Sequence, residues 1–121
     1  MRCALALLIT LATALPGCHA QPRDGTHVTG DRDAGRLALH AYDCGVCHRI
    51  PGVRGANGLV GPPLDRFGMR IYVAGRFPND EDTLVRWIVD PPRLEPLTPM
   101  PAVGVSEDDA RNMAAYLLSL R

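Results

Sequence analysis

The chain has 121 residues, a length that suits one domain, and its 13 basic residues balance its 13 acidic ones. This balance argues against nucleic-acid binding, which needs a basic excess. Aromatic residues make up only 5% of the chain, while glycine and proline number 12 and 11. A small domain with so few large side chains buries little apolar area. The composition therefore predicts that a disulfide, a metal or a prosthetic group stabilises the fold.

The N-terminus has the pattern of an export signal. Arg2 supplies a positive charge, and residues 4–15 form an apolar run too short to span a bilayer comfortably. Two cleavage routes remain open for this signal peptide, which we place at residues 1–20. The stretch LPGC resembles a bacterial lipobox, which would make Cys18 the lipid-bearing first residue, whereas a cut after Ala20 would release an ordinary secreted chain. Either route predicts a periplasmic protein, attached to a membrane only if it carries a lipid anchor.

Residues 21–32 are polar and rich in turn formers, which predicts a flexible tether to a domain over residues 33–121. Asp33 can cap the first helix of that domain, which we expect to run to about Tyr42. Three residues of this helix share one face at helical spacing: Leu37, Ala38 and Ala41.

Residues 49–78 are dense in glycine and proline, which excludes a long helix or a central strand. Loops of this length are uncommon in compact domains unless they fold around something. A second helix then follows Asn79 or Asp80, either of which can cap it, and ends at Asp90 because a proline comes next. Its apolar face is predicted to hold Leu84, Trp87 and Ile88.

A proline-stiffened loop leads into the last helix, where Ser106 and Asp109 form a pair like a capping box. An apolar stripe runs along this helix: Ala110, Met113, Ala114 and Leu117. No segment alternates apolar and polar residues as a strand would. The sequence therefore predicts an all-α fold of three main helices joined by long loops.

The motif Cys44-Gly-Val-Cys47-His48 allows three kinds of site. A structural zinc site needs four ligands, yet no cysteine follows Cys47 and no two histidines have a suitable spacing. A thioredoxin-like redox pair needs a βαβ scaffold, and no strand is predicted on either side. A plain disulfide would close only a tiny loop and constrain little chain entropy. These considerations disfavour the first two kinds of site and a structural disulfide.

The third kind of site is covalent haem attachment, for which Cys-x-x-Cys-His is the signature. Thioether bonds from Cys44 and Cys47 to the haem vinyl groups would fix one edge of the porphyrin. His48 would then be held where its imidazole can bind the iron. The motif thus predicts one covalently bound haem c.

Three methionines are candidates for the second axial ligand of that iron. Met113 lies on the apolar stripe of the last helix, where core packing is the simpler use. Met69 lies nearer to His48 in the sequence. Met100 stands between two prolines that could aim its sulfur from a stiff loop. Position along the chain leaves the choice open.

Five stretches stand in the order seen in class I mono-haem c-type cytochromes: AGRLALHAYDCGVCH, VGPPL, TLVRWIVDPP, LTPMP and ARNMAAYLLSL. Over most of residues 34–121 the chain resembles this family, and in particular bacterial electron carriers, including domains associated with terminal oxidases. The resemblance implies a cytochrome c fold, in which three main helices and long loops enclose one covalently attached haem. It also implies that His48 is the proximal ligand and Met100 the distal ligand.

The resemblance assigns further residues to the surroundings of the haem. Pro62 matches a proline whose carbonyl accepts a hydrogen bond from the proximal histidine and so orients its ring. Trp87 matches an aromatic residue near the methionine sulfur. Thr98 matches a residue that can reach a haem propionate, and Tyr72 would meet a propionate as well.

Three further points follow from comparison with the family. Gly35 and Tyr116 match the close crossing of the first and last helices, where a missing side chain admits an aromatic ring. The chain departs from the family at Leu97, where a glycine is common, so the methionine loop is expected to take a different path. It also has no lysine, so that electrostatic docking of a partner at the haem edge would rely on arginines or be weak.

We therefore expect a monomeric electron carrier that meets its redox partners transiently and catalyses no bond-making reaction. Its haem would have His/Met ligation and would shuttle electrons between respiratory or periplasmic partners. Two alternatives remain open. The chain could be the electron-accepting haem subunit of a dehydrogenase or oxidase complex, or a gas-binding haem sensor if Met100 does not bind iron.

Overall fold

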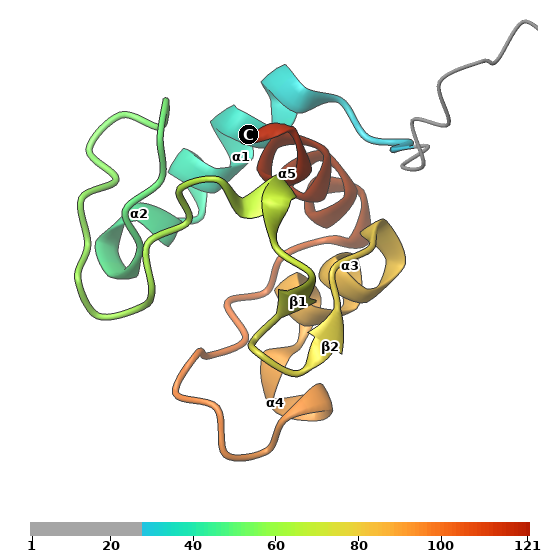
Figure 1. Cartoon of the computed structure of the whole chain (residues 1–121). Helices are drawn as coiled ribbons and strands as arrows, with labels where there is room; N and C mark the ends of the chain where they lie inside the picture. Colours follow the sequence, from blue (N-terminus) through green and yellow to red (C-terminus); the bar gives the residue numbers. More distant parts are fainter. Residues whose placement is uncertain (1–27) are drawn as a thin grey trace, which may run out of the picture.

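A computed structural model describes residues 28–121 of the chain (Figure 1). The predicted signal peptide, Cys18 and Ala20 at its two cleavage sites, and the tether up to residue 27 lie outside the described residues. Over residues 28–121 the fold is all-α, as the sequence predicts, apart from one minimal hairpin. Within this part of the chain, no helix has the length and apolar character needed to cross a membrane.

The described residues form five α-helices, one 3₁₀ turn and two strands of two residues each. In chain order they are α1 (Arg32–Ala41), α2 (Cys44–Cys47), η1 (Phe67–Met69), β1 (Tyr72–Val73), β2 (Phe77–Pro78), α3 (Glu81–Val89), α4 (Pro91–Leu94) and α5 (Glu107–Ser119). The helices α1, α3 and α5 are the longest and correspond to the three predicted ones.

The predicted caps of α3 and α5 are confirmed. Asp80 accepts a hydrogen bond from the backbone N–H of Thr83 at 2.9 Å, and Ser106 accepts one from the backbone N–H of Asp109 at 3.1 Å. The helix α3 also ends at Val89, directly before Asp90 and the proline that follows it. Side-chain oxygens at these positions satisfy N–H groups that have no partner inside the helix.

The predicted start of α1 is wrong by two residues. Its cap is Asp31, whose carboxylate accepts a hydrogen bond from the backbone N–H of Ala34 at 2.7 Å, and Asp33 lies inside the first turn. The backbone N–H of Asp31 donates in turn to Oδ1 of Asn112 on α5 at 2.8 Å. The last residues of the predicted tether are therefore bound to the domain.

The core is built around the crossing of α1 and α5, which lie side by side in Figure 1. The predicted stripe of α5 is confirmed, since Ala110, Met113, Ala114 and Leu117 are all buried. The predicted face of α1 is wrong: Ala38 is buried, but Ala41 and Leu37 are exposed, the latter with 60% of its surface accessible. The helix instead turns Gly35, Ala38 and Leu39 toward the core.

Small residues on α1 explain why its contact face differs from the predicted one. A Cβ atom at Gly35 would overlap the backbone carbonyl of Asn112, so the two helix backbones approach each other directly at this point. The expected close crossing of the first and last helices at Gly35 is therefore confirmed, and the atoms nearest to such a Cβ belong to the backbone of Asn112 and Met113. Tyr116 donates its hydroxyl hydrogen to the carbonyl oxygen of Pro51 at 2.7 Å, and the packing of its ring at Gly35 stays a prediction.

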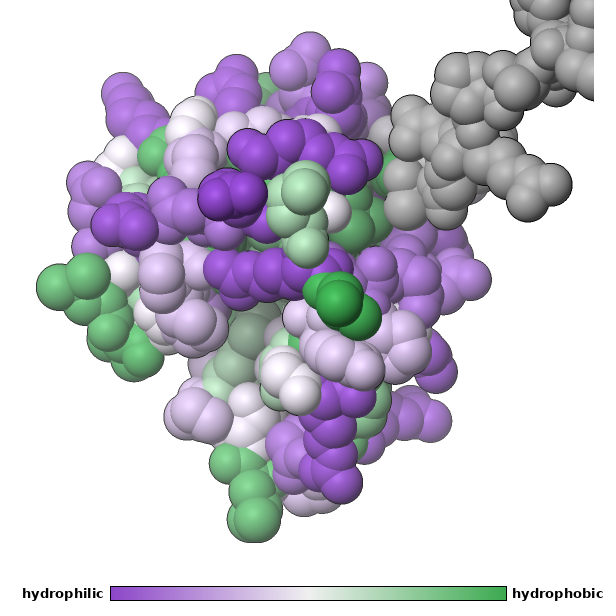
Figure 2. All heavy atoms as spheres, viewed as in Figure 1, coloured by the Kyte–Doolittle hydropathy of each residue, from purple (hydrophilic) through white to green (hydrophobic). Residues whose placement is uncertain are grey.

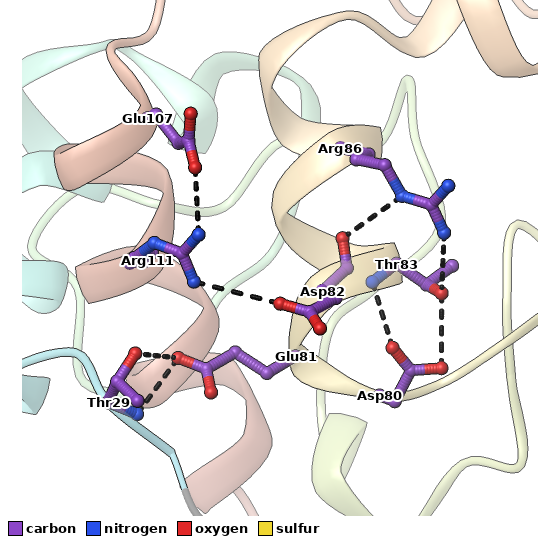
Figure 3. Close-up of polar contacts among 8 residues, drawn as sticks. All are labelled: Thr29, Asp80, Glu81, Asp82, Thr83, Arg86, Glu107 and Arg111. Carbon is purple, nitrogen blue, oxygen red and sulfur yellow. Dashed lines mark hydrogen bonds and ion pairs between the residues drawn. The ribbon is translucent and has the colours of Figure 1, made fainter.

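The helix α3 packs along α5, and charged side chains join the two helices at their rim (Figure 3). Arg111 of α5 pairs with Glu107 of its own helix at 2.7 Å and with Asp82 of α3 at 3.7 Å. Glu81, next to Asp82, accepts hydrogen bonds from the backbone and the hydroxyl of Thr29 at 2.9 and 2.7 Å. These contacts fix the entering chain against the start of α3.

The predicted loops contain short elements that the sequence analysis did not anticipate. In the loop over residues 49–78, β1 and β2 pair as an antiparallel hairpin, with Val73 opposite Phe77. In the proline-rich loop after α3, Asp90 caps the short helix α4, which has proline in its first turn. Proline suits that position because its missing N–H would have no partner there.

Candidate functional site

The two cysteines and the histidine of the motif lie on one tight turn of the chain. Asp43 adopts a left-handed backbone conformation, with φ of 55°, which turns the chain from α1 into the single-turn helix α2. Residues three apart lie on the same side of a helix, so the side chains of Cys44 and Cys47 share a face. Both cysteine side chains are half-buried. His48 follows at the end of α2, where its backbone N–H bonds the carbonyl of Cys44 at 3.0 Å.

The environment of Cys44 does not favour a redox dithiol. Burial raises the pKa of its thiol, and the neighbouring Asp43 carboxylate adds to that increase. Redox-active Cys-x-x-Cys pairs depend on a lowered thiol pKa, which maintains the reactive thiolate. Among residues 28–121, no three His, Cys, Asp or Glu side chains come together as a metal-binding group.

The ring of His48 is held in one orientation. Its Nδ1–H donates to the carbonyl oxygen of Pro62 at 2.7 Å, which is the hydrogen bond expected at this proline. Because a carbonyl can only accept, Nδ1 carries the proton and Nε2 keeps the lone pair that a metal needs. Gly61 lies against the ring, so closely that a Cβ atom there would overlap it. The chain thus presents an imidazole with a defined tautomer.

The three methionines occupy different environments. Met113 is fully buried in the core on α5. Met69 is 53% exposed, and its sulfur lies 3.8 Å from Nη1 of Arg121. Met100 is half-buried and packs against the core from the loop after α4. Of the three methionines, only Met100 is neither fully buried nor largely exposed.

The loop that carries Met100 is ordered by its own backbone contacts. The hydroxyl of Thr98 accepts a hydrogen bond from the backbone N–H of Met100 at 3.3 Å, and the backbone N–H of Thr98 bonds the carbonyl of Glu95 at 3.0 Å. Leu97 is not among the described residues with positive φ, so the loop follows a path that needs no glycine at this position. The role of Thr98 toward a propionate stays a prediction.

Two other residues predicted to lie near the haem have clear structural surroundings. Trp87 is 9% exposed on the buried face of α3, and its ring centroid lies 6.1 Å from that of Phe77 in the hairpin. Tyr72 is 55% exposed on the other strand of that hairpin. Trp87 therefore packs in the core as well, and the roles of both residues toward a haem stay predictions.

The surface around the motif is hollowed and bordered by apolar side chains. Figure 2 shows a recess between the part of the chain that carries α2 and the part around α4, with apolar surface on both sides. Several large apolar residues have most of their surface accessible: Val46, Leu59, Val60, Ile71 and Leu97.

These residues fit a haem. Two thiols share a face, the adjacent imidazole leaves Nε2 available, and a half-buried thioether stands at Met100. Exposed apolar side chains near these groups in the sequence, such as Val46 beside Cys47 and Leu97 near Met100, suit the apolar faces of a porphyrin. A cavity of about 480 Å³ lies elsewhere, between the start of α1 and the end of α5, and none of these groups lines it.

The sequence analysis missed the contacts that hold the segment after α2. Arg49 donates two hydrogen bonds to Asp65, from Nε at 3.0 Å and from Nη2 at 2.7 Å. Arg70 donates to the carbonyls of Pro63 and Asp65 and lies over the ring of Phe67. Nothing in the sequence indicates that Arg49 and Asp65, 16 residues apart, would meet.

The sequence of the chain is similar to those of known proteins. The family model described as "Cytochrome c" matches residues 33–121. The chain is also similar to a "Cytochrome c oxidase subunit 2" from Alkalihalophilus pseudofirmus, with 33% identity over 106 residues. That match covers 87% of this chain but only 30% of the length of the relative.

Proposed function

The chain belongs to the cytochrome c family, and on that basis we propose that it carries electrons through one haem c bound covalently to Cys44 and Cys47. Haem-based electron transfer is the function that the family supports. The observation that carries this assignment is the arrangement of the motif, in which two thiols share a face beside a histidine whose tautomer suits iron binding. The finer proposal is that His48 and Met100 are the axial ligands.

Each residue of the site has a distinct task in this proposal. A bound haem iron supplies one-electron chemistry by cycling between its ferric and ferrous states. His48 binds through Nε2 while the Pro62 carbonyl holds its Nδ1–H, which raises the basicity of the imidazole. Met100 would offer its thioether sulfur from the loop after α4, and a ligand of this kind raises the reduction potential. With His48 and Met100 both bound to the iron, the site would exclude small molecules.

Whether Cys44 and Cys47 anchor the haem can be tested by asking whether the haem is covalently attached. Full-length wild-type protein, matured in a bacterium that attaches haem c, should keep its haem after denaturation and acid–organic extraction. Cys44→Ala and Cys47→Ala should each prevent normal maturation, because each removes one thioether. His40→Ala is a matched control, since His40 is exposed on α1, and it should mature normally. Complete extraction of haem from the wild type would contradict the covalent assignment.

We propose that the protein works in the periplasm with transient redox partners, and that lipidation of Cys18 attaches it to a membrane. A second candidate function, the haem subunit of an oxidase complex, is favoured by the likeness to an oxidase subunit 2. One preparation from native membranes tests both points. We expect mass spectrometry to find a lipid on Cys18 and the protein to elute as a free monomer. An N-terminus at Gln21 would contradict lipidation, and a stoichiometric partner would favour the subunit.

A further inference from the structure

The segment over residues 57–65 lies alongside the motif and supplies the carbonyl that orients His48. Backbone N–H groups of Gly58, Gly61 and Leu64 donate to the carbonyls of Gly45, Cys47 and Arg49 at 3.0, 2.7 and 2.8 Å. Between these anchors stand two prolines, which have no N–H to donate. The direction of the Pro62 carbonyl therefore depends on how firmly the chain on each side of it is held.

One ion pair closes this segment at its far end. Arg49 follows His48 directly, and Asp65 lies three residues after Pro62, so the Arg49–Asp65 pair and the His48–Pro62 hydrogen bond join the same two stretches of chain. Both N–H groups of Arg49 converge on one carboxylate oxygen. The hydrogen bond from Arg49 also holds the pKa of Asp65 below its ordinary value. The carboxylate is thus charged and bound at neutral pH.

The exposure of this pair argues against a role in stability. The side chains of Arg49 and Asp65 are 54% and 40% accessible, and exposed ion pairs contribute little to the free energy of unfolding. The effect of such a pair on geometry is different. The Arg49–Asp65 pair keeps the two stretches of chain together next to the point where the Pro62 carbonyl accepts a hydrogen bond from Nδ1 of His48.

We propose that Arg49 and Asp65 are positioning residues that hold the Pro62 carbonyl on Nδ1 of His48 and thereby set the reduction potential. This inference rests on the proposed function of His48 as an iron ligand. A strong hydrogen bond at Nδ1 makes the imidazole a better electron donor, which favours the ferric state and lowers the potential. Loss of the ion pair weakens that hydrogen bond and raises the potential.

The test removes both charges together, because removing only one would change the potential through its own electric field. The double variant Arg49→Gln/Asp65→Ala keeps the net charge. We expect its reduction equilibrium against a fixed mediator to shift about threefold toward the ferrous form, or about 30 mV for one electron. The Nδ1–H of His48, followed by NMR in the reduced protein, should also exchange faster with D₂O.

The matched control is Arg111→Gln/Glu107→Ala, which removes another exposed ion pair with no change in net charge, on α5. It should leave the potential and the exchange rate unchanged. An unchanged potential and exchange rate in the Arg49/Asp65 variant would overturn the proposal, as would equal shifts in both double variants. If the Arg49 substitution prevents maturation, the single variant Asp65→Ala tests the proposal. In that variant the Nδ1–H of His48 must exchange faster with D₂O than in the wild type.

The same samples separate this proposal from the proposed function. A low-spin spectrum with an unchanged axial ligand set in both double variants means that the function stands, whichever way the potential moves. A wild-type spectrum without histidine ligation would contradict the function itself, before the ion pair is considered.

Discussion

Met100→Ala is expected to abolish the red-region band in which a methionine sulfur transfers charge to ferric iron. The thioether is the proposed distal ligand, so the variant should bind carbon monoxide readily in its reduced form. Its reduction potential should fall by on the order of 0.1 V or more, a modest part of the roughly 0.8 V over which axial ligands set haem potentials. Absorption spectra and a redox titration measure all three effects.

The other two methionines provide matched controls. Met69→Ala changes an exposed side chain and should alter neither the band nor the potential. Met113→Ala should keep the band but lose roughly 2–5 kcal/mol of stability, because it leaves a cavity in the core. If Met100→Ala keeps the band, Met100 is not the ligand. An open sixth position in the wild type would then favour the gas-binding alternative.

Gly35→Ala is expected to destabilise the protein by about 2 kcal/mol or more. The new methyl group would overlap the carbonyl of Asn112, and the obstacle is helix backbone, which cannot turn aside as a side chain does. Alanine stabilises a helix by up to about 1 kcal/mol relative to glycine, and this gain offsets only part of the cost. Urea unfolding of the haem-bound protein, followed by far-UV circular dichroism, measures the loss.

A second substitution on α1 distinguishes the effect of the close helix crossing from the effect of helix propensity. Leu37 is 60% exposed, so Leu37→Ala should change the free energy of unfolding by less than about 0.5 kcal/mol. If Gly35→Ala proves as harmless as Leu37→Ala, the backbones of α1 and α5 do not meet as described. A large loss of stability in Leu37→Ala alone would instead indicate that the face predicted from the sequence, which includes Leu37, packs in the core.

The helix ends that could be predicted are those set by capping residues close by in the sequence. Asp80 and Ser106 cap α3 and α5 because each places an oxygen three residues before an N–H that needs an acceptor. The same logic applies to Asp31, which stands two residues before the aspartate chosen from the sequence. Its advantage over Asp33 comes from Asn112, 81 residues away, which binds its backbone.

The face that α1 buries could not be predicted from periodicity, because periodicity weighs side chains by their hydrophobicity. The partner helix approaches so closely that only small residues fit, and Gly35 is preferred over Leu37 at the contact. The short helix α4 was predictable in principle, since Asp90 followed by proline is a helix start. Its four residues are too few for a periodic pattern.

The candidate site divides in a similar way. Cys44, Cys47 and His48 form one local motif, and their chemistry is evident from the five letters that contain them. The resemblance to a family supplied Pro62, whose carbonyl then proved to bind His48. Arg49 and Asp65 belong to no motif and meet only because the segment between them folds back. Such pairs are visible in a structure and not in a sequence.

The crossing of α1 and α5 also dictates when this domain can fold. Its two halves come from opposite ends of the described chain, as the bond between Asp31 and Asn112 shows. Because synthesis begins at the N-terminus, α1 emerges from the ribosome long before α5 exists. The core can therefore close only once the last helix has been made. Until then the side chains of Cys44 and Cys47, half-buried in the finished fold, lack the cover that the closed core provides.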